Sequence, residues 1–154
     1  MRIYLDACCV CRPFDDPTIE RNRIEAEAML SVLSLVQQQQ IEWIASPVLN
    51  AELNQIADEE RREQATTLLK LAVELGPMPD RLTTEKLVAG GFKPLDAMHV
   101  AAAINSRCDV FLTTDDRLLR AAKRMTPLLP LHICSPLTFL VEQFDVDDHR
   151  DDPE

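Results

Sequence analysis

The chain has 154 residues, of which 46% are hydrophobic and 27% are charged, and it carries a formal net charge of −10. This composition is typical of a single globular domain and excludes a disordered or fibrous chain. The negative charge also argues against a protein whose whole surface is positively charged for nucleic-acid binding.

Charge, hydropathy and cysteine content also bear on where the protein is located. The segment 145–154 is strongly acidic, and we expect it to be a disordered tail behind a domain that spans residues 1–144. No apolar run approaches the ~18 residues of a membrane span, and the N-terminal residues lack the apolar core of a signal peptide. The odd number of cysteines, five, is typical of a reducing compartment. We therefore expect a cytoplasmic protein that does not bind membranes.

The first half of the chain alternates short apolar runs with segments of helical periodicity. Residues 2–6 are predicted to form a buried strand, followed by a loop at 7–17 that contains two prolines. A helix is predicted over about 18–38, because apolar residues recur there at helical spacing. A second strand follows at 41–45, and a serine before a proline predicts the start of a helix over about 46–57.

The second half continues the same alternation and determines the fold class. Helices are predicted over about 58–75, 81–89, 94–106, 116–125 and 136–144, and strands over 109–113 and 131–134. Strands that alternate with helices in this way form parallel sheets. We therefore predict an α/β fold with three layers, α/β/α, around a central parallel sheet of four to five strands.

Four acidic residues are predicted to lie together at one edge of this sheet. Asp6 ends the first strand, Asp115 follows the third, and Glu52 and Asp96 lie on helices that begin beside the same edge. Ligand sites of such sheets lie beyond the carboxyl ends of the strands. Each residue also has an ordinary interpretation, as a turn residue, a helix N-cap or an exposed helix edge. The shared position of all four favours one site.

A cluster of carboxylates needs a counter-charge. Two carboxylates about 4 Å apart repel by roughly 4 kcal/mol at an effective dielectric constant near 20. Mg²⁺ and Mn²⁺ prefer oxygen ligands and relieve this repulsion. Such an ion activates water and neutralises charge on a phosphodiester, so the cluster predicts metal-dependent phosphodiester hydrolysis.

The segments around these acids resemble one protein family. IYLDACC, SPVLNAEL, KPLDAMHVAAA and VFLTTDDRLL, in this order between residues 3 and 119, resemble the PIN-domain family of nucleases, which includes VapC-type toxins. The resemblance implies that Asp6, Glu52, Asp96 and Asp115 form the catalytic site, and that Asp6, Asp96 and Asp115 bind Mg²⁺ or Mn²⁺. It also implies cleavage of single-stranded RNA, a homodimer, and a small antitoxin protein that blocks the site.

Several residues near the predicted site are open to more than one interpretation. Cys8 stands where family members commonly have Asn or Ser, and a thiol is a poor ligand for a hard cation. Asp116, adjacent to Asp115, is an alternative fourth acid or a second contact. Thr113 could support the site by hydrogen bonding. His99 could assist proton transfer or be a structural histidine.

Basic and thiol-rich segments give weaker signals. Arg12, in CRPFDD, either contacts a substrate phosphate or is a surface arginine. The same two interpretations apply to a basic stretch after the fourth acid, made of Arg117, Arg120, Lys123 and Arg124. Cys8, Cys9 and Cys11 are closely spaced, but the other cysteines and the three histidines are scattered. We therefore do not expect a zinc site.

These observations favour an Mg²⁺- or Mn²⁺-dependent endoribonuclease that acts as the toxin of a toxin–antitoxin pair. The alternative from a different class is a non-catalytic PIN-like module that binds RNA or a protein, which Cys8 and the negative charge motivate. A nuclease for structured DNA is a third possibility. Metal binding separates the module from the nucleases, and a comparison of RNA with branched DNA separates the two nucleases.

Overall fold

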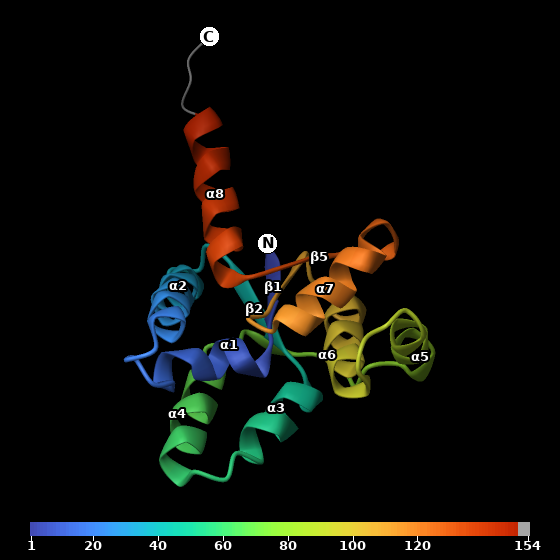
Figure 1. The fold of residues 1–154 in the computed structure, drawn as a ribbon, viewed down its shortest axis with the longest axis horizontal. Helices are drawn as coiled ribbons and strands as arrows, with labels where there is room; N and C mark the ends of the chain where they lie inside the picture. Colours follow the sequence, from blue (N-terminus) through green and yellow to red (C-terminus); the bar gives the residue numbers. More distant parts are fainter. Residues whose placement is uncertain (151–154) are drawn as a thin grey trace.

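The centre of the fold is a five-stranded sheet in which all strands are parallel (Figure 1). The computed structural model describes residues 1–150, with side chains up to Asp145. In the spatial order 3-2-1-4-5 along the sheet, the strands are β1 (Arg2–Leu5), β2 (Glu42–Ala45), β3 (Glu74–Leu75), β4 (Val110–Leu112) and β5 (His132–Cys134). The predicted α/β fold with a parallel sheet is therefore confirmed.

Helices cover both faces of the sheet and complete the three predicted layers. They are α1 (Ala7–Cys11), α2 (Glu20–Gln37), α3 (Pro47–Asn54), α4 (Glu59–Leu69), α5 (Arg81–Ala89), α6 (Pro94–Asn105), α7 (Asp116–Met125) and α8 (Pro136–Arg150). Helices α2 and α8 pack against each other on one face, while α6, with α5 packed on it, and α7 lie on the other (Figure 1). None of the described helices combines the length and the hydropathy that a bilayer span requires.

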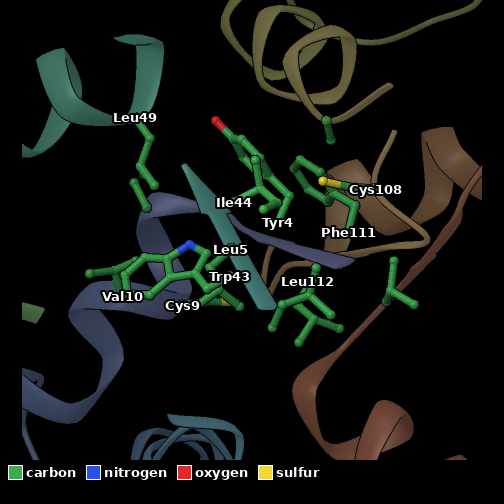
Figure 2. Close-up of a cluster of buried hydrophobic side chains, with 14 of the residues drawn as sticks. Tyr4, Leu5, Cys9, Val10, Trp43, Ile44, Leu49, Cys108, Phe111 and Leu112 are labelled. Carbon is green, nitrogen blue, oxygen red and sulfur yellow. The ribbon is translucent and has the colours of Figure 1, made fainter. Parts of the chain in front are cut away.

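Strand side chains point alternately to the two faces of the sheet and build a separate core on each face. Tyr4 and Phe111 stack with ring centroids 5.2 Å apart on the face that α6 covers (Figure 2). Trp43 and Leu5 lie on the opposite face, beside the residues of α1 (Figure 2). All four side chains are fully buried. The central strands are thus held from both sides, which fixes the positions at which they end.

The segment that follows β1 differs from its prediction. Residues 7–17 are predicted as a loop, but they contain α1 and a 3-10 turn at Arg12–Phe14. The reason is local, because the Asp6 side chain accepts a hydrogen bond from the Ala7 N–H and caps α1. Strand β1 accordingly ends at Leu5, and Asp6 is the first residue beyond it.

Two predicted helix ends are also wrong. The helix predicted over 58–75 ends at Leu69, and residues 74–75 form β3, which pairs with β2. Apolar residues between α4 and β3 continue the helical spacing, so the sequence pattern conceals this break. Helix α8 extends to Arg150, so the predicted disordered tail does not begin at residue 145. The rest of that tail, 151–154, lies outside the described residues.

The strand register brings the ends of β1 and β4 together. Leu5 pairs with Leu112, and the Asp6 N–H donates to the Leu112 carbonyl oxygen at 3.0 Å. Asp6 and Thr113, the next residue of each chain segment, are therefore neighbours. Strand β1 also lies between β2 and β4, where the strand order reverses. In open α/β sheets, such a reversal opens a crevice in which ligands bind.

Candidate metal centre

Asp6 is the most buried carboxylate at this edge of the sheet, with 7% of its surface exposed. Its Oδ1 accepts from the Ala7 N–H at 2.9 Å, and its Oδ2 accepts from the Thr113 hydroxyl at 2.8 Å. Burial raises the pKa of Asp6, while the nearby His99 and the Thr113 hydrogen bond act in the opposite direction. Hydrogen bonds therefore hold the Asp6 carboxylate in one orientation. Its negative charge is poorly solvated, and a bound cation would compensate for the missing solvation.

Thr113 links Asp6 to Asp115. It is fully buried, and its hydroxyl donates to Asp6 while accepting from the Asp115 N–H at 3.1 Å. Asp115 caps α7, because its Oδ1 accepts from the Arg117 N–H at 2.8 Å and from the Leu118 N–H at 3.4 Å. The ordinary N-cap role is thus correct for Asp115. Since no hydrogen bond reaches its Oδ2 within the described residues, that oxygen remains available to a ligand.

Glu52 is held by a chain of three further side chains. Its Oε2 lies 2.5 Å from Nε2 of His99, whose Nδ1 lies 2.7 Å from the Tyr4 hydroxyl oxygen. That oxygen lies 2.6 Å from Oγ of Ser46, which also accepts from the Leu49 N–H and so caps α3. With a neutral His99, Ser46 donates to Tyr4, Tyr4 donates to Nδ1, and the Nε2–H donates to Glu52. Each atom along this chain, from Oγ of Ser46 to Oε2 of Glu52, then has a hydrogen-bond partner.

Asp96, in the first turn of α6, lacks such support. Its side chain is half-buried, and no hydrogen bond reaches it within the described residues. Burial, together with the negative charges of Asp6 and Asp115, raises the pKa of Asp96 to about 6. Asp96 therefore lies close enough to both to be repelled by them.

The structure thus brings all four predicted acids to one edge of the sheet, and we call Asp6, Glu52, Asp96 and Asp115 the acid cluster. Ligand atoms of Asp6, Glu52 and His99 lie within 4.8 Å of one another. Among the described residues, no lysine or arginine forms an ion pair with the acid cluster, and Glu52 has only His99. An unpaired set of carboxylate oxygens is the donor set that a hard divalent cation prefers.

Comparison with known families agrees with this geometry. The sequence model of the PIN domain matches residues 3–124, which is most of the chain. This protein belongs to the PIN-domain family. PIN domains are generally nucleases, so the acid cluster lies in a nuclease-type fold. No curated protein sequence matches the chain.

Asp116 of this PIN domain pairs with an arginine rather than with the acid cluster. Both of its carboxylate oxygens accept from the Arg21 guanidinium, at 2.8 and 2.9 Å. The bidentate pair connects the start of α7 to α2 and lowers the pKa of Asp116. Of the two adjacent acids, Asp115 is therefore the one that the structure places beside Asp96.

Arg12 is largely engaged inside the PIN domain. Its guanidinium donates to Asp15 at 2.8 Å, to Asn22 at 2.9 Å and to the Thr114 hydroxyl at 3.1 Å. Only 18% of the side chain is exposed. These bonds tie the turn after α1 to the start of the loop that carries Asp115. Most donors of Arg12 are thus already used, so a phosphate would have to compete with these partners.

Cys8 takes part in the hydrogen bonds around Asp6. Its thiol lies 3.4 Å from both Asp6 Oδ2 and the Thr113 hydroxyl, and its sulfur accepts from the Thr114 N–H at 3.4 Å. A hydrogen bond with the Cys9 thiol lowers the pKa of Cys8, and burial acts against this effect. The thiol can therefore support Asp6 as a weak donor without binding the ion itself.

A basic surface borders the acid cluster on the side of α6 and α7. Lys93, Arg117, Arg120 and Arg124 line a hollow that contains Asp96, and three of them line a second hollow that contains Asp115. Within the described residues, none of the four forms an ion pair. We call these four residues the basic rim. Lys123, predicted with the same stretch, lines a different hollow beside β5.

Three residues around the site are absent from the set of site residues that the sequence predicts: Tyr4, Ser46 and Lys93. Tyr4 lies in the segment 2–6 that is predicted as a buried strand, but its hydroxyl also holds His99. The signal available in the sequence is that Tyr4 lies two residues before Asp6. Because side chains alternate along a strand, Tyr4 points toward the face of the sheet that α6 covers. Lys93 lies far from the basic stretch of α7 in sequence, so only the fold reveals that they share a surface.

Proposed function

We propose that this PIN domain is an Mg²⁺- or Mn²⁺-dependent endoribonuclease that hydrolyses phosphodiester bonds in single-stranded RNA. The observation that carries the proposal is the unpaired acid cluster at the switch point of the sheet. Asp6, Asp96 and Asp115 would hold the ion, because none of their carboxylates forms an ion pair with a lysine or arginine in the part of the chain that the structure describes. When bound, the ion supplies Lewis acidity that acidifies water and neutralises charge building on the phosphodiester.

Other residues of the chain position the carboxylates and accept the proton of the attacking water. The Thr113 hydroxyl donates to the Asp6 carboxylate and accepts from the backbone N–H of Asp115, and so ties the residue that carries each carboxylate to the other. The chain from His99 to Ser46 fixes Glu52 through its Oε2. Its Oε1 accepts no hydrogen bond within the described residues and can therefore accept a proton from the attacking water. Such positioning lowers the entropic cost of the reaction.

The basic rim supports a nucleic acid as the substrate. A chain with a net charge of −10 repels polyanions over most of its surface. The four cations of the basic rim form a local exception, since they line the hollows that contain Asp96 and Asp115 and have no ion-pair partner among the described residues. An RNA strand whose phosphates contact the basic rim would pass next to the carboxylates.

The direct test is cleavage of single-stranded RNA of mixed sequence, with Mg²⁺, with Mn²⁺ and with a chelator. We expect cleavage only with metal, and a loss of about a thousandfold in Asp6→Asn, which removes one charge at nearly constant shape. Asp109→Asn is the matched control, because Asp109 precedes β4 at the opposite edge of the sheet and accepts from the Arg2 N–H. This control should cleave as the wild type does.

Other outcomes separate the alternatives. Cleavage that persists in Asp6→Asn would overturn the mechanism. RNA binding without cleavage under any metal condition would identify a non-catalytic module. A preference for branched DNA over single-stranded RNA would identify a structure-specific DNA nuclease. Each result needs only the same purified protein and a second labelled substrate.

We further propose that the protein is the cytoplasmic toxin of a toxin–antitoxin pair, that it forms a homodimer, and that a small antitoxin protein blocks the acid cluster. This part rests on the resemblance of the motifs around Asp6, Glu52, Asp96 and Asp115. Induced expression should arrest growth of a bacterial host, and Asp6→Asn should relieve the arrest at equal protein level. Growth arrest by the inactive variant would contradict a toxin role that acts through RNA cleavage.

A further inference from the structure

A second group of metal-binding side chains lies between β5 and α8. It consists of His132 and Cys134, the first and last residues of β5, and Glu142 on α8. The three share no residue with the acid cluster. Potential ligand atoms of the three side chains all lie within 4.8 Å of one another.

The fold explains why these residues meet. His132 and Cys134 are two positions apart on one strand, so their side chains point to the same face of the sheet. Cys134 pairs with Leu112, and both side chains point to the face of the sheet on which α2 and α8 pack against each other. Helix α8 therefore covers the face to which His132 and Cys134 point. Ser135 alone separates β5 from α8 and caps the helix through its hydroxyl, which accepts from the Thr138 N–H at 3.1 Å. The short connection brings Glu142 over the strand.

Contacts within the group already point its polar atoms toward one another. Nε2 of His132 lies 3.2 Å from a carboxylate oxygen of Glu142. Their side chains are 52% and 48% exposed, whereas Cys134 is buried behind them. Solvent can therefore reach the group from outside, and the thiol forms its inner wall. Because β5 is the edge strand of the sheet, no further strand blocks this approach.

We propose that His132, Cys134 and Glu142 form a zinc site. One imidazole nitrogen, one thiol sulfur and one carboxylate oxygen are the ligand types that Zn²⁺ accepts together, whereas Mg²⁺ prefers oxygen alone. Three protein ligands leave the fourth tetrahedral position to water, which the exposure of His132 and Glu142 allows. Binding releases the Cys134 thiol proton, and His132 keeps its remaining proton on Nδ1.

Strand β5 and helix α8 make the proposed zinc site rigid. Two ligands on one strand and a third on the following helix are held by regular backbone rather than by a loop. Zinc would therefore cross-link α8 to the edge of the sheet. Because an ion that binds only the folded chain stabilises it, Zn²⁺ should raise the melting temperature. The site is independent of the proposed nuclease function.

The test uses metal-stripped protein with excess Mg²⁺, so that the acid cluster does not compete for the probe ion. Titration with Co²⁺ should give a sulfur-to-metal absorption band at one equivalent, and Zn²⁺ should displace the Co²⁺. Cys134→Ser should abolish the band, and His132→Ala should weaken Zn²⁺ binding by at least about tenfold. Cys108→Ser, another buried cysteine, is the matched control and should retain the band.

A further variant distinguishes the loss of a zinc ligand from a failure to fold. Glu142→Gln changes an exposed side chain and should fold normally, yet it should also weaken Zn²⁺ binding by about tenfold. Asp6→Asn should bind Zn²⁺ as the wild type does, which separates this site from the acid cluster. A sulfur band that survives in Cys134→Ser, or the absence of any stoichiometric Co²⁺ or Zn²⁺ binding, would overturn the proposal.

Discussion

Glu52 and Asp96 lie at the same edge of the sheet but have opposite surroundings. Glu52 receives its hydrogen bond from His99, which Tyr4 and Ser46 hold in turn. Asp96 receives no hydrogen bond within the described residues, and burial and neighbouring acids raise its pKa to about 6. One carboxylate is thus stabilised by the protein, and the other is left repelled by its neighbours.

The difference suggests a division of roles. A carboxylate that the protein already orients is prepared to accept a proton or hold a water molecule. A carboxylate that the protein leaves unsatisfied gains most when a cation arrives. We therefore expect substitutions at Asp96 to act through metal binding and substitutions around Glu52 to act through positioning.

The largest expected effect is the loss of RNA cleavage that the substitution Asp96→Asn causes. We expect a loss of about a thousandfold at ordinary Mn²⁺ concentrations, because the ion loses a ligand. Raising the Mn²⁺ concentration should restore part of the rate. Glu52→Gln should lose about a hundredfold or more, and additional Mn²⁺ should not restore it. Equal rescue of Asp96→Asn and Glu52→Gln by additional Mn²⁺ would show that the two carboxylates have the same role in cleavage.

The next effect is on stability as a function of pH. The folded chain holds the Asp96 proton more tightly than the unfolded chain, since the pKa rises from 3.8 to about 6. The stabilising contribution is therefore complete below pH 4 and is lost as the pH rises to about 6. Without metal, the wild type should lose about 1 kcal/mol of unfolding free energy over this range relative to Asp96→Asn. Urea unfolding at pH 4 and pH 7 measures it, and parallel pH curves for the two proteins would count against the predicted shift.

The basic rim should affect substrate binding more than the chemical step. Replacing Arg117 and Arg120 by Ala should raise KM several-fold, leave kcat nearly unchanged, and lower the salt dependence of RNA binding by about 1.4 in log–log slope. Lys93→Ala should lower the slope by about 0.7, and Lys70→Ala, an exposed lysine at the end of α4, is its matched control. An unchanged slope would place the RNA path elsewhere.

The smallest effect on cleavage should come from Tyr4→Phe. The substitution removes the donor to Nδ1 of His99 and leaves a buried nitrogen without its partner, at a cost of about 1–2 kcal/mol. Cleavage should fall only a few-fold, because Glu52 keeps its bond to Nε2. Thermal unfolding and the pH–rate profile test this, since a purely structural role for Tyr4 would leave the shape of the profile unchanged.

The acids were predictable from sequence because each position depends on a nearby strand or helix end. Asp6 directly follows β1 and Asp115 lies three residues after the end of β4, and apolar runs reveal both strands. Glu52 lies on a helix whose serine and proline mark its start. Strand β3 was not predictable, because two residues carry too short a pattern and only pairing with β2 defines them.

Contacts between distant elements also escaped prediction. The hydrogen bond between Tyr4 and His99 depends on which face of β1 meets α6. The group formed by His132, Cys134 and Glu142 depends on how α8 folds back over β5, and in sequence these residues are a scattered histidine, cysteine and glutamate. Such meetings follow from register and helix direction, which local sequence patterns do not contain.

Calorimetric titration with Mn²⁺ tests most directly whether the acid cluster is a metal site with this division of roles. The wild type should bind Mn²⁺, Asp96→Asn should bind it at least about tenfold more weakly, and Glu52→Gln should bind it within a few-fold of the wild type. Absence of Mn²⁺ binding to the wild type, or equal affinity in the wild type and Asp96→Asn, would show that the acid cluster is not a metal site of this kind.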